Sequence, residues 1–198
     1  MANYTGPKVK LSRRVDVPIA DNPKHTQRQL TKPGVHGYRG RRLRDYGVRL
    51  NEKQKLRYHY NVLEKQFRRY LDDAGRKKGN TGDVLLTLLE RRLDNVIRRL
   101  GFARTIWGAR QMVSHGHIIV NGRKTDRPSF ALNVGDVITI KERAHKLVRE
   151  NLESLPGHEV APWLSFDPSS LTANIVSEPT TDQVPFDVNL NLIVEFYR

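Results

Sequence analysis

The sequence predicts an α+β protein with a small helical domain, an α/β domain containing an antiparallel sheet, and an extended basic N-terminal arm. Apolar residues recur at helical spacing between residues 51 and 100. An Asn-Gly pair follows a β-branched run at 118–120, which indicates a hairpin. Prolines interrupt the first 33 residues. We therefore expect an arm at 1–50, a helical domain at 51–91 and an α/β domain at 92–182.

The arm is predicted to be extended because it shows no sustained apolar periodicity and cannot form a core alone. Its charge comes from Lys8, Lys10, Arg13, Arg14, Arg39, Arg41, Arg42 and Arg44. A flexible solvated tail is the alternative. However, the run from Gly34 to Tyr38 mixes aromatic and backbone-permissive residues, which is rare in simple tails. We expect the arm to become ordered against a partner.

The helical domain is expected to begin at Asn51, which resembles a capping box with Gln54. The apolar face of this helix carries Leu56, Tyr60, Leu63, Phe67 and Leu71. The run RKKGNTG at 76–82 should end it, and Thr81 should cap a second helix. That helix carries Val84, Leu85, Leu88 and Leu89. For the cations on the outer faces, RNA contact and simple solvation both remain open.

The α/β domain should start with a helix whose buried stripe carries Leu93, Val96, Ile97 and Leu100. Gly101 should end it, and Thr105 should cap a second helix that continues to Gly116. The core-facing edge of the second helix carries Ile106, Ala109 and Val113. A hairpin at 118–124 follows, with its turn at Asn121-Gly122. Beyond it we expect a helix at 144–155 and strands at 163–166, 173–176 and 190–196.

The two helices and the hairpin are predicted to present a continuous surface of cationic and amide groups, called here the basic rim. The basic rim comprises Arg104, Arg110, Gln111, His115, His117, Arg123 and Lys124. Arg92 and Arg99 should project from the other sides of the first helix. Metal binding by His115 and His117 is the alternative, but no carboxylate or thiolate partners are adjacent. The basic rim therefore favours RNA docking.

The net charge of +14 is unevenly distributed along the chain. Residues 1–80 hold 21 Lys and Arg against 7 Asp and Glu, residues 91–149 hold 13 against 4, and residues 150–198 hold 1 against 8. This asymmetry favours a polyanion as the partner of the basic part. The acidic part should face away from it or toward a basic protein. No basic stretch carries a membrane-inserting apolar face, so nucleic acid is favoured over a membrane.

The 198 residues suffice for one to two modest domains, and the absence of cysteine excludes disulfides. The first residues lack the apolar core of a signal peptide, and no apolar run reaches about 18 residues, so we expect a cytoplasmic protein. The sequence contains no GxxxxGK[ST], HExxH or GxSxG motif. We therefore expect that the chain is not an enzyme.

The segment 92–141 resembles the RNA-binding domain of the S-four family of small-subunit ribosomal proteins, a module that several RNA-modifying enzymes also carry. The resemblance extends to KPGVHG at 32–37, to residues 45–96 beginning DYGVRLNEKQKLRYHY, and to the tail LNLIVEFYR at 190–198. These motifs together cover nearly the whole chain. On them, the chain is identified as resembling a bacterial-type member of this family.

The resemblance implies a structural constituent of the small ribosomal subunit that binds rRNA at a 5′-domain junction and nucleates assembly of the subunit body. It also implies an αL RNA-binding motif at 92–141, and a tail, 183–198, that completes the helical domain. Neighbouring proteins would be S-three and S-five at the mRNA entry region, where relatives influence translational accuracy, and some repress translation of their own mRNA. Many relatives hold zinc with a cysteine pair. Val9 and Ser12 stand at the corresponding positions, so we expect no metal and no cofactor.

Two other classes of protein fit the sequence less well. An RNA-modifying enzyme would need a catalytic domain, for which residues 150–198 are too few; a DNA-binding protein would need a recognition helix with a dimerising element, and none is evident. The residues expected to contact RNA are Lys8, Lys10, Arg13, Arg14, His36, Arg39, Arg41, Arg42, Arg44, Arg49, Lys53, Lys55, Arg57, Arg68, Arg69, Arg76, Lys77, Lys78, Arg92, Arg99, Arg104, Thr105, Arg110, Gln111, His115, His117, Asn121, Arg123 and Lys124.

Overall fold

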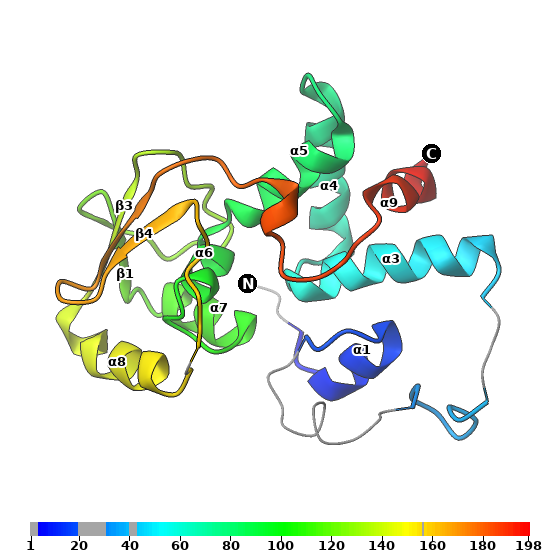
Figure 1. Ribbon diagram of the computed structural model, residues 1–198, viewed down its shortest axis with the longest axis horizontal. Helices are drawn as coiled ribbons and strands as arrows, with labels where there is room; N and C mark the ends of the chain where they lie inside the picture. The colour runs from blue at the N-terminus through cyan, green and yellow to red at the C-terminus, as the bar shows by residue number, and fades with distance from the viewer. Residues whose placement is uncertain (1–3, 20–30, 40–42, 156) are drawn as a thin grey trace. The chain divides into compact units, whose positions relative to one another are not determined.

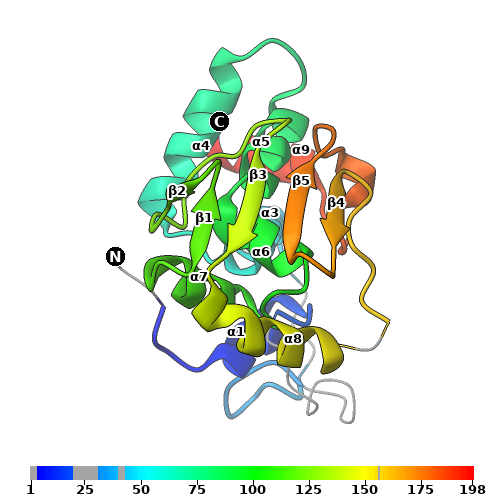
Figure 2. The same cartoon turned by 90° about the vertical axis from the view of Figure 1, so that its left-hand side faces the viewer.

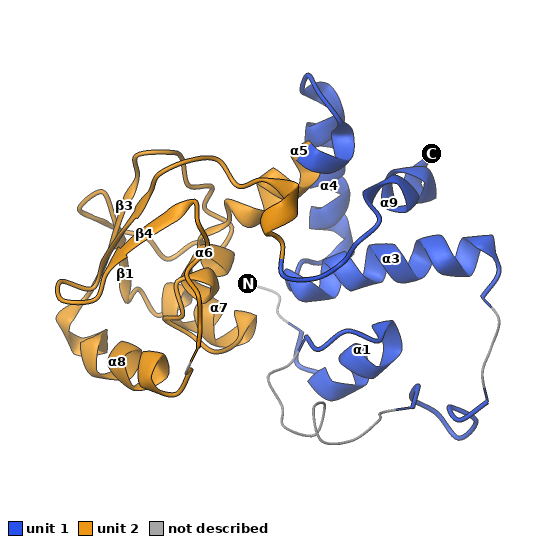
Figure 3. Ribbon diagram, in the orientation of Figure 1, with its two compact units in different colours: residues 1–83, 185–198 blue, residues 84–184 orange. Residues whose placement is uncertain are grey.

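The computed structural model describes residues 4–19, 31–39, 43–155 and 157–198 (Figure 1). The chain divides into two compact units, which are coloured separately in Figure 3. The first unit comprises residues 1–83 and 185–198, and the second comprises residues 84–184. The C-terminal tail therefore folds with the N-terminal part of the chain.

The first unit is helical. It contains α1 (Lys8–Val15), α3 (Asp45–His59), α4 (Glu64–Arg76), the start of α5 (Thr81–Glu90) and α9 (Leu190–Tyr197). Leu56, Phe67 and Ile193 have no exposed surface, and α9 packs against α3. Lys53 of α3 donates to Glu64 of α4 at 2.9 Å, and the Tyr197 hydroxyl of α9 donates to the same Glu64 oxygen. Glu64 thus joins three helices.

The N-terminal arm is not extended throughout, which corrects the expectation from sequence. Residues 8–15 form α1, whose Leu11, Ser12 and Val15 are buried, and α1 contacts α3. Leu11 and Val15 are four residues apart and share one helical face. A stripe of two apolar residues is too short for periodicity to reveal, so tertiary contact rather than local pattern defines this helix.

The single helix expected from Asn51 is also wrong. Helix α3 begins at Asp45, so Asn51 lies inside it and makes no capping box with Gln54. A turn at residues 60–63, with Asn61 at a φ of 49°, separates α3 from α4. The next helix does begin at Thr81, but the side chain that accepts a backbone N–H, from Gly82 at 3.0 Å, is that of Asn80.

The second unit is built on a five-stranded antiparallel sheet with the order β2-β1-β3-β5-β4 (Figure 2). The strands are β1 (Ile118–Val120), β2 (Arg123–Lys124), β3 (Val137–Ile140), β4 (Leu164–Asp167) and β5 (Thr172–Ile175). The helices are the rest of α5 from Val84, α6 (Leu93–Arg99), α7 (Ile106–Ser114) and α8 (His145–Glu153), with short 3-10 turns at Glu142–Ala144 and Thr181–Gln183. Figure 1 shows α6 and α7 on one face of this sheet. The predicted α+β fold class is confirmed.

The core of the second unit confirms most of the pattern expected for it. The stripe Leu93, Val96, Ile97 and Leu100 has no exposed surface and belongs to one apolar cluster with the inner face of the sheet. Gly101 and Gly116 end their helices with positive φ. The Thr105 hydroxyl caps α7 by accepting from the Gly108 N–H at 3.1 Å. The expected helix at 144–155 is α8, and the strands at 163–166 and 173–176 are β4 and β5.

The strand expected at 190–196 is wrong, because these residues form α9. The run LNLIVEFY has both strand-like alternation and helical spacing, and Asn189 selects the helix by accepting from the Leu192 N–H. Contacts with α3 stabilise the helix further, since Arg49 of α3 pairs with Glu195 of α9 at 3.0 Å. Tertiary packing therefore overrides β-branched propensity here.

A buried network of charged side chains lies at the start of α6. Arg92 holds Asp94 through two hydrogen bonds of 3.0 and 2.7 Å, and both side chains are essentially unexposed. Glu90 accepts from Arg99 through two bonds of 3.1 and 2.8 Å and from the Asn95 amide at 2.7 Å. Paired carboxylates and guanidinium groups of this geometry satisfy one another in the absence of water.

Replacement of Arg92 by alanine should destabilise the second unit by about 3–5 kcal/mol, because Asp94 would stay buried without its two-point partner. The free energy of unfolding, followed by the fluorescence of Trp107 and Trp163 in urea, measures this loss. The matched control is Arg123→Ala, which removes an exposed guanidinium and should change stability by less than about 0.5 kcal/mol. Equal stabilities of the two variants would contradict a structural role for Arg92.

Acid should weaken the first unit through Glu64. Burial raises the pKa of this carboxyl, but hydrogen bonds from Tyr197, Lys53 and Arg57 outweigh burial and lower the pKa below its usual 4.5. Because the folded pKa is the lower one, the stabilisation is complete above the unfolded pKa and disappears as pH falls through the folded pKa. Glu64→Gln should therefore lose stability at neutral pH, by about 0.2–1 kcal/mol after screening, but not in strong acid. Amide exchange in α3 and α9, compared between Glu64→Gln and the unmodified chain at neutral pH and in strong acid, tests this.

Candidate nucleic-acid interface

The basic rim of the second unit is formed where α7 meets the hairpin. Gln111 and His115 are exposed at the end of α7, and Arg123 and Lys124 are exposed on β2. The Lys124 side chain lies against Gly116, where an added Cβ would collide with it. Lys124 thus folds back over the connection from α7 to β1, so the hairpin and the helix share one cationic surface.

A cavity of about 380 Å³ opens beside this surface. Its polar lining consists of Arg104, Thr105, Gln111, His115, His117 and Asn151, and its apolar lining includes Met112 and Leu147. Arg104 is exposed before the start of α7, and Asn151 is held in place by donating to the Phe102 carbonyl at 2.9 Å. The cavity therefore combines a cation, amides and imidazoles, which are the groups that bind phosphates and 2′-hydroxyls in RNA.

Arg143 belongs to this site although the sequence analysis missed it. Its Nη2 donates to the His115 carbonyl at 3.0 Å, and its Nε donates to His117 Nδ1 at 3.3 Å. Burial, reinforced by the positive charges of Arg143, His115 and Lys141, lowers the pKa of His117 below its usual 6.5. His117 is therefore a neutral acceptor at pH 7. The only sequence signal was the basic run around Lys141, which carried no motif.

The hairpin itself borders a second hollow of about 630 Å³ that includes Arg123, Lys124, Arg127 and Phe130. Phe130 is 38% exposed, so an aromatic face lies beside three cations. Asn121 was expected to contact RNA, but its side chain is engaged with the start of β3. Its Nδ2 donates to Asp136 at 2.8 Å, and its Oδ1 accepts from the Val137 N–H at 2.9 Å. Asn121 thus holds the turn.

Four expected contact residues do not face solvent as predicted. Arg92, Arg110 and Lys53 are 1%, 7% and 4% exposed, and only 12% of the Arg99 side chain is exposed. Each interacts with a carboxylate of the protein. Arg92 pairs with Asp94, on which the charge of Arg110 also acts, Arg99 pairs with Glu90, and Lys53 pairs with Glu64. Charge interaction with a carboxylate of the protein therefore accounts for these cations, and the outward placement of Arg110 was wrong.

In the first unit, several cations on α3 and one on α1 are also engaged. Lys55 pairs with Glu52 at 2.7 Å, Arg57 pairs with Glu64 at 2.9 Å, and Arg49 pairs with Glu195. Arg13 donates to the Thr31 carbonyl at 2.8 Å. These side chains are partly exposed, so each keeps some solvent-facing surface while its charge is directed toward the protein.

The remaining candidates in the first unit that the structure describes are exposed. They are Lys8, Lys10, Arg14, His36, Arg39, Arg44, Arg68, Arg69, Arg76, Lys77 and Lys78. The Arg39 guanidinium lies 5.6 Å from the Tyr38 ring, and Tyr38 is 67% exposed. Arg41 and Arg42 lie outside the described residues.

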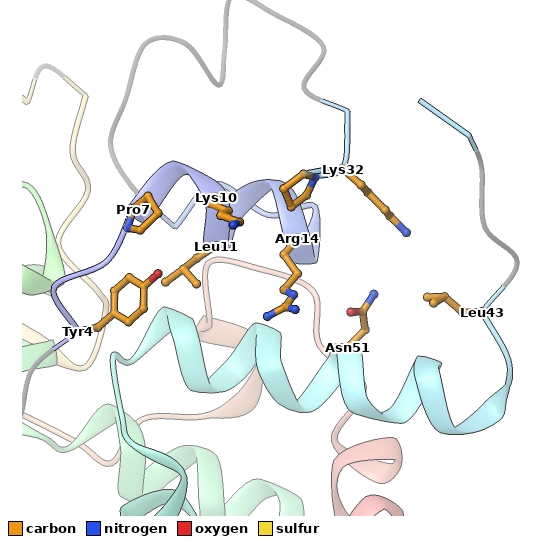
Figure 4. A pocket seen from close by; sticks show the side chains of 9 residues that line it. Tyr4, Pro7, Lys10, Leu11, Arg14, Lys32, Leu43 and Asn51 are labelled. Carbon is orange, nitrogen blue, oxygen red and sulfur yellow. The ribbon is translucent and has the colours of Figure 1, made fainter. Parts of the chain in front are cut away.

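A further hollow of about 500 Å³ lies between α1 and α3 (Figure 4). Lys10 and Arg14 of α1, Lys32 and Asn51 supply its polar lining. Tyr4, Pro7 and Leu11 supply apolar surface. Figure 4 shows Arg14 and Asn51 extending into the space between the two helices. Lys32 was missed by the sequence analysis, since a lone lysine before a proline carries no pattern.

Among the residues that the structure describes, no group of three or more acidic or histidine side chains could hold a metal ion. Ser12, one of the two positions for which the resemblance implied a metal-binding cysteine in relatives, is buried and accepts from the Ile19 N–H at 3.1 Å. Its hydroxyl thus makes a contact within the N-terminal segment. No helix in the described part of the chain is long and apolar enough to span a membrane.

Comparison with known proteins shows which class of protein the chain belongs to. Residues 3–90 match the family described as "Ribosomal protein S4/S9 N-terminal domain", and residues 91–138 match the S4 domain, an RNA-binding module. The fold and the matched domains define a ribosomal RNA-binding protein. The proteins named "Small ribosomal subunit protein uS4" from Persephonella marina, Akkermansia muciniphila and Thermus thermophilus are 47%, 49% and 45% identical. Each alignment covers 100% of this chain and 99% of the relative.

The chain belongs to the S4 (S-four) family of small-subunit ribosomal proteins. This confirms the resemblance found in the sequence. The family consists of structural proteins of the cytoplasmic ribosome and not of enzymes, so the expected class and location are also confirmed. The family assignment leaves open which residues bind RNA.

The combined variant Arg104→Ala, Gln111→Ala, Arg123→Ala and Lys124→Ala should bind small-subunit rRNA at least about 100-fold more weakly than the unmodified chain. Hydrogen bonds to charged groups contribute roughly 1.5–3 kcal/mol each. Stability should change little, because exposed substitutions usually cost less than about 0.5 kcal/mol each. Filter binding measures the affinity, and thermal unfolding measures the stability.

A control replaces Lys146 and Arg149, two exposed cations of α8, by alanine and so removes two positive charges, against three in the rim variant. It should weaken binding by less than about tenfold, as expected for screened charges away from the contact surface. If the rim variant bound within about threefold of the unmodified chain, the rim would be an ordinary solvated surface.

Proposed function

We propose that the chain is a primary binding protein for small-subunit rRNA and that the basic rim with its cavity is the centre of its RNA interface. The observation that carries this proposal is the convergence of Arg104, Gln111, His115 and His117 around one cavity. Lys124 of the hairpin lies against the adjacent Gly116. Family membership supports it, because the chain is a structural constituent of the small ribosomal subunit.

The proposed mechanism is electrostatic and involves no covalent step. Arg104, Arg123 and Lys124 neutralise phosphates and release condensed counterions. Gln111 in the second half of α7 and the Thr105 region at its start supply hydrogen bonds suited to the 2′-hydroxyls that distinguish RNA from DNA. Phe130 and Tyr38 offer exposed rings on which unpaired bases stack.

The exposed cations of α1, α4 and residues 31–39 extend the interface over the first unit. On this proposal, the arm at 1–50 binds RNA, and a helical domain at 51–91 is completed by the tail 183–198. The α/β domain at 92–182 then carries the αL motif. We leave four cations out of the proposed RNA contacts because they are buried or paired within the protein: Arg92, Arg99, Arg110 and Lys53.

The biological role that we infer is early binding to a multi-helix junction in the 5′ domain of the rRNA, which nucleates assembly of the subunit body. Apart from Asn151 in the cavity lining, the acidic segment 150–198 faces away from RNA, toward the neighbouring proteins S-five and S-three at the mRNA entry region. There the chain contributes to translational accuracy. A folded segment of its own mRNA that mimics the rRNA junction would compete for the same surface and repress translation.

The two alternative functions, an RNA-modifying enzyme and a DNA-binding protein, have less support. Residues 164–175 form a hairpin of the same sheet as the basic rim, and residues 190–197 form α9, so the segment 150–198 does not build a separate catalytic domain. A DNA-binding role has no support in the family assignment. RNA footprinting with the purified protein tests the proposed junction directly.

The affinity for rRNA should fall steeply with salt if the interface extends over both units. Each neutralised phosphate contributes about −0.7 to −0.9 to the slope of log K against log salt concentration. A slope of about −4 or steeper is expected from at least six contacts. A slope no steeper than about −2 would correspond to two or three phosphates and would contradict the extended interface.

A further inference from the structure

Four cationic or ionisable side chains converge around Gly116, and we call them the Gly116 cluster: His115, His117, Lys124 and Arg143. Lys124 covers Gly116, and Arg143 bonds both to the His115 carbonyl and to His117 Nδ1. The two imidazole rings lie 6.1 Å apart. The cluster thus draws on the α7–β1 connection, on β2 and on the 3-10 turn at Glu142–Ala144.

The charge around this cluster is of one sign among the described residues that act on it. Arg143, His115 and Lys141 act on His117, Lys124 lies over the adjacent glycine, and Arg104 lines the same cavity. None of these groups is a carboxylate. A cluster of like charges on rigid elements is an unfavourable arrangement until an anion binds to it.

We propose that the Gly116 cluster binds one phosphate group of the RNA and that His117 takes up one proton when that phosphate binds. The proposal rests on the proposed RNA-binding function and adds Arg143 to the interface. It also makes the affinity for RNA depend on pH through a single named residue.

The hydrogen bond from Arg143 requires that His117 Nδ1 carry no proton in the unbound protein. A bound phosphate brings a negative charge next to the ring, which reverses the effect of the neighbouring cations and favours the imidazolium form. The proton comes from solvent and adds to Nδ1, while the Arg143 Nε bond to that atom is released. Both groups then donate to phosphate oxygens, so that a neutral acceptor becomes a second charged donor.

The first experiment measures affinity for a transcript of the 5′ domain of small-subunit rRNA between about pH 5.5 and pH 8 at constant ionic strength. Affinity should rise as pH falls, by roughly tenfold for each unit by which RNA raises the pKa of His117. His117→Gln keeps a hydrogen-bonding side chain that does not titrate, so the rise attributable to His117 should vanish. His158→Gln is the matched control, because His158 is an exposed histidine that bonds to the Arg99 carbonyl. It should retain the rise.

The second experiment follows the imidazole resonance of His117 by NMR in the free and RNA-bound full-length chain. The pKa of His117 should be higher in the complex. Arg143→Gln should raise the pKa of His117 in the free protein, because it removes the nearest cation, and should weaken RNA binding. This measurement is informative even if His117→Gln is less stable than the unmodified chain.

The outcomes separate the two proposals. If the chain binds the transcript but the pH dependence is the same in His117→Gln, or if the pKa of His117 does not rise on binding, the Gly116 cluster is not a proton-linked phosphate site. The proposed function then stands. If the chain does not bind the transcript at any pH, the proposed function itself fails.

Discussion

The geometry of the basic surface depends on the buried charge network at the start of α6. The first backbone N–H groups of that helix have no partner within it, and they are satisfied from the segment that follows the hairpin. Leu93 and Asp94 donate to the carbonyls of Phe130 and Pro128 at 2.9 and 3.1 Å, and Leu132 donates to Arg91 at 2.9 Å. Arg92 and Asp94, paired between these bonds, fill the same buried space. The network therefore ties the hairpin to the helices that carry the rest of the rim.

This arrangement divides the arginines into two groups that the sequence does not distinguish. Arg92 and Arg99 neutralise Asp94 and Glu90 in the interior, whereas Arg104 and Arg123 face solvent. The basic composition is thus partly a structural requirement, because a carboxylate left buried without a cation is strongly destabilising. Positive charge alone is a poor guide to which residues contact RNA. Ion pairing within the protein has to be excluded first.

The apolar pattern of the second unit was predictable because its signals are local. The stripe beginning at Leu93, the Thr105 cap and the turn at Asn121-Gly122 each depend on neighbouring residues. The predictions that were wrong or missed concern residues whose partners lie far away in the sequence. Helix α1 buries two apolar residues against α3, and α9 is held by Arg49 and Glu64, far away in sequence. Arg110 was misplaced for the same reason, since Asp94, on which it acts, belongs to the preceding helix. Arg143 was missed because it comes close to its two acceptors, on His115 and His117, only after β3 pairs with β1.

The like-charged cluster around Gly116 follows from the same anchoring. Cations that repel one another would spread into solvent if their backbones were free to move. Here β1 is paired on both sides, by β2 and by β3, and Lys141 donates its backbone N–H to the His117 carbonyl at 2.9 Å. Arg143 is further held by the His115 carbonyl. Backbone bonds thus keep the charges together in the unbound protein, and the proposed binding of a phosphate there would relieve their repulsion without reorganising the fold. Preorganisation of this kind lowers the entropic cost of binding, so a small surface can contribute strongly to affinity.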